Sequence, residues 1–590
     1  MTYSMRWMIA GPLLVAACST SEQPSPNPPP PWGVPISGGT LLVTQDGRYA
    51  VVSDPDRDRL VTVELAGVPR VVAELELQEG DEPGRLIEDG AGRVHVALRR
   101  GGALLTVDPL LAAPVRRAAC AEPRGLAWAS ATDVVYLACA SGELMTFPAA
   151  GGDATRVVRL DRDLRDVVVS GDELIVTRFR SAEILTVAAD GTVASRVAAP
   201  TVQRAAIDFG APPEDPLPSV DAVATVAWRT VPLPTGGALM LHQRHLRSAL
   251  GTESGGYGKG CRGPAEDAMT VIRPGVAPVA VRSFANGALP VDLALSPEGD
   301  RLAVVTAGTR EVYVDAAALD EPDRDDCDRG VFPRVVPFTD DLGAPTSVAW
   351  TATGGLLVYY PELPGLVFRS GTDLTAATTI KLPGPVGYDS GRALFHRATG
   401  SGLACATCHP EGRDDGQVWE FAELGLRRTQ SLAGGVEARA PFHWSGDMED
   451  LPMLMQRVFV ERMSGPTPTR SEGLSLGPWL DRIPAPAAIV ADAAAVERGR
   501  QLFNSSALGC VSCHGGPAYS SYQRFDVGTG GPFKTPSLLG VSARTPLMHD
   551  GCAATLRDRF TTCGGGDAHG VTSMLSDAQL DDLIALLESL

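Results

Sequence analysis

The first half of the chain alternates short apolar runs with polar turns at a regular spacing. The stretch GRYAVVSDPDRDRLVTVEL begins at Gly47, and GRVHVALRRGGALLTVDP begins at Gly92. Similar stretches begin at Asp133 and Asp172, so the copies start at nearly even intervals. Each contains two apolar runs of strand length around a polar turn, which is the pattern of a β-hairpin.

Later copies begin at Gly299 and Gly354, and residues 219–290 hold one more copy that is interrupted by GTESGGYGKGC. A period of about 40–45 residues with several strands in each unit is typical of a β-propeller blade. We therefore predict an all-β propeller, seven-bladed, over residues 36–380; a pair of β-sandwiches is the alternative, which the even repetition disfavours. The repeats resemble the YVTN-type surface propellers. His242 and His245 are candidate ligands facing the channel, or residues that only satisfy local hydrogen bonds.

The end of the chain has a different period. In SDAQLDDLIALLESL the apolar positions 580, 583, 584 and 587 follow helical spacing, and Ser576 with Gln579 forms a predicted capping box. Two further helices are predicted where GRALFHRATG begins at Gly391 and GRQLFNSSALG begins at Gly499. The second half is therefore predicted to be all-α.

Each of these two helices runs into a CxxCH motif, first as ACATCHP and then as GCVSCHG. A four-cysteine zinc site joins its two CxxC pairs over about 15–20 residues, and Cys408 and Cys510 lie far outside that range. A thioredoxin-like CxxC does not need the histidine. Covalent c-type haem needs all three residues, because two thiols bind the vinyl groups and the histidine binds iron. The predicted haem-linked cysteines are Cys405, Cys408, Cys510 and Cys513, and the predicted proximal ligands are His409 and His514.

The similarity between the two regions extends beyond the motifs. RTQSLAGGVEARAPFHWSGDMEDL from Arg428 matches KTPSLLGVSARTPLMHDGCAATL from Lys534. The spacing from His409 to His443 agrees, to within a single position, with the spacing from His514 to His549. One unit has been duplicated, so we predict two class I cytochrome c domains, residues 385–485 and 490–590, with two covalently bound haem c groups.

The chain begins as an exported protein would. MTYSMRWMIAGPLLVAAC has a signal-peptide pattern over residues 1–17, and its end resembles the bacterial lipoprotein box, which implies lipidation of Cys18. A proline-rich tether follows over residues 18–35. We expect an outer-membrane lipoprotein that faces the periplasm or the cell surface, with the lipid anchor as its membrane contact. The net charge of −19 argues against nucleic acid as a partner.

Six cysteines remain once haem and lipid are assigned, an even number that suggests disulfides in an oxidising compartment. Proximity in the chain favours Cys120–Cys139 and Cys552–Cys563, which leaves Cys261–Cys327.

The sequence TPSLLGVSARTPLMHDG, together with the two CxxCH motifs, resembles the bacterial di-haem cytochrome c peroxidase family, which includes the MauG-like proteins. The resemblance covers about residues 385–590. It implies two facing cytochrome domains, one haem that takes up electrons, one that binds peroxide, a redox protein as partner, and a calcium ion. The propeller departs from the family pattern and puts the usual substrate in doubt.

The second axial ligand of each iron decides between electron transfer and peroxide chemistry, because a thioether closes the position. Met463 and Met574 are the candidate distal ligands, each at a similar distance along the chain from its proximal histidine. The family's C-terminal methionine would fall close to Cys563, where this chain has none. His443 and His549 are candidates for distal ligation or for lining the haem. Three carboxylates are acid–base candidates by location only, and none is assigned a catalytic role: Glu437, Glu449 and Glu461.

Three hypotheses follow. The chain is a peroxidase-like oxidoreductase, an electron carrier with both irons capped, or a propeller that binds a partner and carries accessory haems.

Overall fold

The computed structural model describes residues 32–207, 218–259, 263–284, 287–323, 327, 342–371, 373–489 and 491–590. The predicted signal peptide, Cys18 and nearly all of the tether lie outside these residues, as does Cys261.

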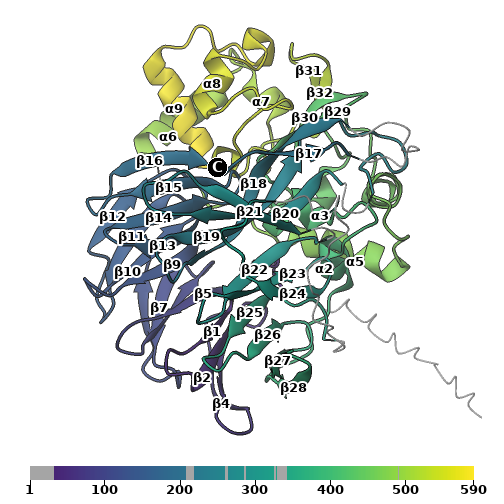
Figure 1. The fold of residues 1–590 in the computed structure, drawn as a ribbon. Helices are drawn as coiled ribbons and strands as arrows, with labels where there is room; N and C mark the ends of the chain where they lie inside the picture. Colours follow the sequence, from purple (N-terminus) through teal and green to yellow (C-terminus); the bar gives the residue numbers. More distant parts are fainter. Residues whose placement is uncertain are drawn as a thin grey trace, which may run out of the picture.

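Seven antiparallel sheets form a seven-bladed propeller, as the repeats predict (Figure 1). Blades one to four have four strands each. In chain order the strands are β1 (Leu41–Val43), β2 (Tyr49–Asp54), β3 (Arg59–Glu64) and β4 (Arg70–Glu76); β5 (Pro83–Glu88), β6 (Val94–Leu98), β7 (Ala103–Val107) and β8 (Val115–Ala118); β9 (Pro123–Ala129), β10 (Val134–Cys139), β11 (Glu143–Pro148) and β12 (Arg156–Arg159); and β13 (Leu164–Ser170), β14 (Glu173–Arg178), β15 (Glu183–Val187) and β16 (Val193–Ala198).

The interrupted copy is blade five, which has five strands instead of four. Its strands are β17 (Val202–Ala205), β18 (Ser219–Pro232), β19 (Ala238–Leu246), β20 (Ala265–Ile272) and β21 (Val279–Phe284). Blade six has β22 (Pro290–Leu295), β23 (Arg301–Thr306) and β24 (Glu311–Ala316), and blade seven has β25 (Ser347–Trp350), β26 (Leu356–Tyr360), β27 (Gly365–Ser370) and β28 (Ala376–Lys381).

The ring closes where β1 lies beside β25, and the Thr40 amide donates to the Ser347 hydroxyl across this seam at 2.8 Å. The apolar cores lie between neighbouring blades. At the seam, for example, Val52 and Val61 of blade one pack against Leu357 of blade seven. A single blade cannot bury both of its faces, so the stacking of neighbours and the closure of the ring supply the core.

Two cytochrome-like units follow the propeller. The first contains α2 (Ser390–His396), α3 (Cys405–Cys408), η2 (Pro410–Gly412), β29 (Val418–Phe421), β30 (Gly425–Arg428), η3 (Glu437–Arg439), α4 (Leu451–Leu454), η4 (Met455–Arg462) and α5 (Arg470–Asp481). The second contains α6 (Ala493–Phe503), α7 (Cys510–Cys513), β31 (Arg524–Asp526), β32 (Pro532–Lys534), η5 (Val541–Ala543), α8 (Leu556–Thr561), η6 (Gly566–His569) and α9 (Asp577–Glu588).

In both units the first and last helices cross closely, α2 with α5 and α6 with α9. The duplicated glycine explains the crossing. A Cβ at Gly391 would collide with the backbone of Ser475, and one at Gly499 with the carbonyl of Asp582. The predicted capping box of α9 is present, with Ser576 and Gln579 as its two partners.

Candidate haem-binding sites

The second CxxCH motif opens onto a cavity of about 480 Å³. Helix α7 carries Cys510 and Cys513 as free thiols on its wall, followed by His514. Residues of the first unit, among them Phe442 and Trp444, complete the wall. Ligand pockets typically enclose about 300–1,000 Å³, so the cavity has the size and the donor groups for a covalently bound haem.

Two histidines face each other in this cavity. The rings of His514 and His569 have centroids 6.3 Å apart and planes inclined by 23°. Each ring uses Nδ1 on a backbone carbonyl: His514 on Tyr519 at 3.0 Å and His569 on Gly564 at 3.1 Å. Their Nε2 atoms are thus left for a metal, as is usual for ligating histidines. Imidazole–metal bonds of about 2 Å on opposite sides of one ion separate the ring centroids by roughly 6 Å.

His569 was missed by the sequence reasoning, although a signal existed. It follows His514 at nearly the same spacing as Met463 follows His409. The Arg559 guanidinium of α8 donates to the His569 carbonyl at 2.6 Å and fixes the segment. Burial, with the nearby charge of Arg559, lowers the pKa of His569 to about 3, so its imidazole is neutral at pH 7.

The structure does not bring Met574 to this cavity. Its side chain is 65% exposed and does not contribute to the wall. The turn after η6 is the physical reason, because the Asp567 carboxylate accepts from the amides of Thr572 and Ser573, each at 3.0 Å. Gly570, Val571 and Thr572 still line the cavity, and the chain has left it by Met574.

The cavity wall carries more cations than anions. Lys534 donates through Nζ to the Arg439 carbonyl and lies 5.7 Å from the centre of the Phe442 ring. Burial lowers the pKa of Lys534 to about 8. Arg544 donates to the Ser537 carbonyl, while its buried Nε has no partner. These groups fit the two carboxylates of a haem, and the orphaned Nε of Arg544 is a donor placed for such an anion.

The first CxxCH motif lies deeper. Cys405 and Cys408 of α3 are free thiols, and burial raises the pKa of Cys405 to about 12. His409 places Nδ1 on the Arg413 carbonyl at 3.1 Å, the same arrangement as at the second motif. Met463, the residue after η4, is 5% exposed and packs in the same apolar core as Ala404 and Ala406 of this motif. Its carbonyl accepts from the Ser401 amide at 3.1 Å, and its role as a distal ligand stays a prediction.

The matched histidines make different contacts. His443 contacts Asp447 through Nδ1 at 3.3 Å, and His549 stacks on Phe533 with ring centroids 4.0 Å apart. Trp444 joins the units: its indole donates to the Arg428 carbonyl at 2.7 Å, and its own carbonyl accepts from the Lys534 amide at 2.8 Å. An aromatic side chain thus reaches from the first unit into the cavity of the second.

The remaining candidates lie elsewhere. The three carboxylates named as acid–base candidates, Glu437, Glu449 and Glu461, do not line the described cavities, and Glu461 pairs with Arg457 at the surface. His242 is satisfied by Thr270 at 2.9 Å and by the Gln243 carbonyl at 3.0 Å, so its role is structural. His245 does not face the channel as a free ligand: it stacks on Trp419 of the first unit, with ring centroids 4.0 Å apart.

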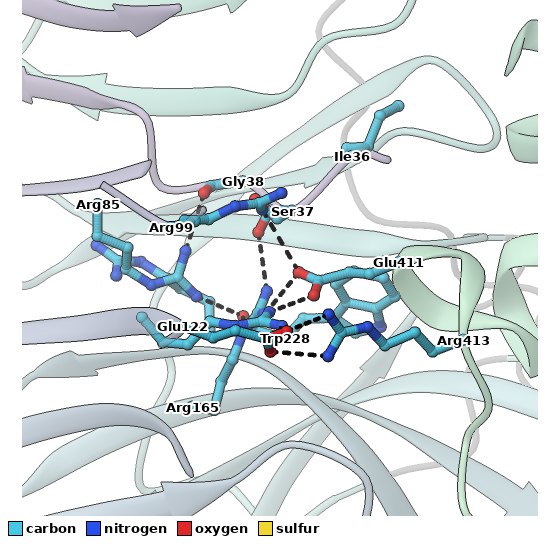
Figure 2. A network of polar contacts seen from close by, with 12 residues as sticks. Ile36, Ser37, Gly38, Arg85, Arg99, Glu122, Arg165, Trp228, Glu411 and Arg413 are labelled. Atoms are coloured by element: carbon cyan, nitrogen blue, oxygen red, sulfur yellow. Dashed lines mark hydrogen bonds and ion pairs between the residues drawn. The ribbon is translucent and has the colours of Figure 1, made fainter. Parts of the chain in front are cut away.

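The segment just after the first motif enters the mouth of the propeller channel (Figure 2). Glu411, in a left-handed conformation with φ of 53°, is 5% exposed. Its carboxylate accepts from Arg165 at 2.7 Å and also from Arg124. Although burial raises the pKa of Glu411, these two charges hold it well below its usual range.

The propeller anchors these arginines in turn. Arg165 also donates to the carbonyls of Ser37 at 2.9 Å and Trp228 at 3.0 Å. Beside it, Arg413 makes a two-pronged contact with Glu122 at 2.6 and 2.8 Å (Figure 2). This contact was not predicted. The first unit is thus attached to the propeller through buried charges on both sides of the interface.

The disulfides Cys120–Cys139 and Cys552–Cys563 form as proximity favours, and Cys327 is disulfide-bonded, while its expected partner Cys261 lies outside the described residues. Within the described part of the chain, no helix has the length and apolarity needed to cross a membrane. The same residues contain no cluster of three His, Cys, Asp or Glu side chains placed to hold a metal ion.

One family model and several known proteins match this chain. The cytochrome c family model matches residues 496–590. Hydrazine synthase subunit gamma of Kuenenia stuttgartiensis is 26% identical over an alignment of 254 positions, which spans 32% of this chain and 72% of the relative. Among solved structures, a chain of Kuenenia stuttgartiensis hydrazine synthase covers 60% of this chain and 98% of its own length at 14% identity and a TM-score of 0.43. A streptogramin B lyase covers 56% of this chain and 92% of its own at 10% identity and a TM-score of 0.38. The chain therefore ends in a cytochrome c domain, the kind of domain that binds haem c covalently.

Proposed function

We propose that this protein is an oxidoreductase with two c-type haems, one on each CxxCH motif. In this proposal the second site serves electron transfer and the first site reacts with a small oxidant such as hydrogen peroxide. The observation that carries the division of roles is the facing pair His514 and His569. Bound haem would supply one-electron redox chemistry at each iron.

The second site is closed to exogenous ligands in this proposal. His514 would hold the metal on one face and His569 on the other, and both imidazoles are kept in the required tautomer by carbonyl contacts at Nδ1. With no open position, this site suits electron transfer. Lys534 and Arg544 would hold the haem carboxylates at the boundary between the units.

The first site differs because its distal candidate is a thioether. His409 would ligate on the proximal side and Met463 on the distal side. Peroxide chemistry requires that Met463 leave this position. The second candidate function, an electron carrier, is favoured by the deep burial of Met463, since a methionine that never leaves keeps both sites closed.

Trp444 supports communication between the two sites. It belongs to the first unit, lines the cavity of the second, and is hydrogen-bonded to both through Arg428 and Lys534. An aromatic side chain held rigidly in this position offers a route for electrons between the two motifs.

The wider setting is also part of the proposal. The lipid anchor on Cys18 and the tether would hold the protein at the outer membrane, where a redox protein partner would exchange electrons with it. A calcium ion, which the family resemblance implies, is also part of the proposal. The likeness to a hydrazine synthase subunit is compatible with a haem redox role and leaves the substrate of the first site open between peroxide and a small nitrogen compound.

The test uses the full chain after haem attachment in a bacterial periplasm. We expect EPR of the oxidised protein to show two low-spin signals. Peroxide added after half-reduction should change the signal of the first haem. His569→Ala should turn the second signal high-spin. Met463→Ala should do so for the first, while the matched control Met574→Ala should leave both unchanged.

Two outcomes would contradict the proposal. A high-spin signal from Met574→Ala with none from His569→Ala would reverse the ligand assignment. If the protein is inert to peroxide both when oxidised and when half-reduced, the peroxide reaction is excluded and the electron-carrier function is favoured.

A further inference from the structure

The propeller sends one insertion across the first cytochrome unit. Between β19 and β20 the chain leaves blade five, and residues 247–259, here called the strap, run over the first unit before the strand resumes. The strap is the stretch that interrupts the fifth repeat in the sequence. The propeller fold does not require this insertion, and its contacts lie on the first cytochrome unit.

One end of the strap is fixed to the β29–β30 hairpin. The Leu250 amide donates to the Glu420 carbonyl at 2.8 Å, and the Ala422 amide donates to the Leu250 carbonyl at 2.9 Å. Leu250 is buried in an apolar cluster with Trp419, against which Cys408 packs. The strap therefore extends this hairpin by one strand-like residue next to the first haem motif.

The other end of the strap holds the end of η4. The Gly255 amide donates to the Glu461 carbonyl at 2.8 Å, and the Tyr257 amide donates to the Arg462 carbonyl at 3.1 Å. In return the Arg462 guanidinium donates to the Thr252 carbonyl at 3.2 Å. The next residue after Arg462 is Met463, so the strap holds the two residues before the candidate distal ligand, whose own amide and carbonyl are bonded to Val458 and Ser401.

Tyr257 is the side chain at the centre of these contacts. Its hydroxyl lies near the Arg462 guanidinium: burial raises the pKa of Tyr257, and the charge of Arg462 counteracts this rise. Its ring lies 6.1 Å from that of Phe421 and packs against apolar residues on both sides of the first motif. One side chain thus joins the propeller, the hairpin and the end of η4.

We propose that Tyr257 is a positioning residue for Met463, so that the propeller decides whether the distal position of the first site is closed. The inference rests on the proposed function, because it takes Met463 as the distal ligand. The physical argument is that η4 is a π-helix, a form that is rare and is found at functional sites. The strap supplies two backbone hydrogen bonds to the end of this helix, one acceptor for the Arg462 guanidinium, and the contact of Tyr257.

The strap can therefore act on the chemistry of the first site without touching a substrate. While Tyr257 holds Arg462, Met463 stays in place and the site is closed. When that contact loosens, Met463 can move away and leave the position open to a small oxidant.

The experiment compares Tyr257→Phe and Tyr257→Ala with Met463→Ala in the full haem-loaded chain. The readouts are the high-spin fraction of the first haem by EPR and its midpoint potential by spectroelectrochemistry. Tyr257→Phe removes only the hydroxyl beside the Arg462 guanidinium, so we expect it to raise the equilibrium for Met463 release by about tenfold. Tyr257→Ala should raise it further, toward the spectrum of Met463→Ala. Tyr388→Ala, an exposed tyrosine just before α2, is the matched control and should change nothing.

The outcomes separate the two proposals. If Met463→Ala changes the first haem signal but both Tyr257 variants match the wild type, the role of Tyr257 is wrong and the ligand assignment stands. If Met463→Ala is silent, the ligand assignment fails and the inference falls with it. Tyr257→Phe keeps the ring and the packing, so it remains informative should Tyr257→Ala fail to fold.

Discussion

Replacing Glu411 by glutamine should loosen the attachment of the first cytochrome unit to the propeller. The carboxylate sits at the channel mouth between Arg165, at 2.7 Å, and Arg124, with Arg99 at 3.7 Å. Glutamine keeps the shape of the side chain and removes the charge. The two main arginines would then remain buried without the anion that balances them.

The magnitude follows from the burial of the partners. Arg165 is 1% exposed, and burial lowers its pKa to about 9 even with Glu411 in place. Breaking a buried ion pair by removing one partner costs about 3–5 kcal/mol. Arg165 keeps its bonds to the carbonyls of Ser37 and Trp228, which offset part of this cost. We therefore expect the free energy that docks the segment 410–415 to fall by an amount at the lower end of this range.

Native-state hydrogen exchange of residues 410–417 measures this loss directly, because these amides exchange when the segment leaves the channel. A cost of about 3 kcal/mol corresponds to roughly a hundredfold faster exchange, since 1.36 kcal/mol is a factor of ten. Glu497→Gln, on the exposed face of α6, is the control and should stay within about 0.5 kcal/mol of the wild type. Exchange in Glu411→Gln within threefold of that control would refute the view that buried charge holds the two parts together.

Three further outcomes can be checked. Trp444→Ala should slow electron exchange between the two haems in a flash-reduction experiment, whereas static spectra should stay those of the wild type; an unchanged rate would exclude Trp444 from the path. Burial raises the pKa of Glu122, but Arg413 lowers it to about 2, below the ordinary 4.5. This contribution to stability is therefore present above pH 4.5 and lost as pH falls toward 2. In the wild type, hydrogen exchange of the 410–417 amides should gain an extra acceleration over this pH range, and Glu122→Gln should lack it. The Cys552–Cys563 disulfide closes a loop of 11 residues, so its removal should cost about 3 kcal/mol; calorimetry of the double serine variant would show a normal melting temperature if the bond were dispensable.

The propeller could be predicted because its information is local and repeated. Each copy from Gly47 to Gly354 carries its own strands and turn, and the period alone indicates stacked blades. The haem motifs are equally local, since Cys510, Cys513 and His514 lie together on a single turn. Because the unit is duplicated, Gly391 and Gly499 occupy equivalent positions, and a helix crossing occurs at each.

The residues that were not predicted depend on contacts distant in the chain. His569 meets His514 across the cavity only because Arg559 and the Asp567 turn shape the segment around it, and Met574, the nearer match by residue type, is directed outward. Glu411 is bound by Arg165, 246 residues earlier, and by Arg124, 287 residues earlier. No local pattern distinguishes such a carboxylate from one on the surface.

These contacts bear on the hypothesis that the propeller is an independent binding module. If the propeller were a separable module, removal of the haem units would leave no charged or polar group on its surface without its partner. Here removal would leave Arg124 and Arg165 without Glu411, and Glu122 without Arg413, at the channel mouth. It would also leave Leu250 and Tyr257 of the strap without the hairpin and the helix end that cover them. The channel mouth and the strap are therefore internal surfaces of one folded unit. In the proposed function, a partner protein would dock on another face of the propeller or at the second cytochrome unit.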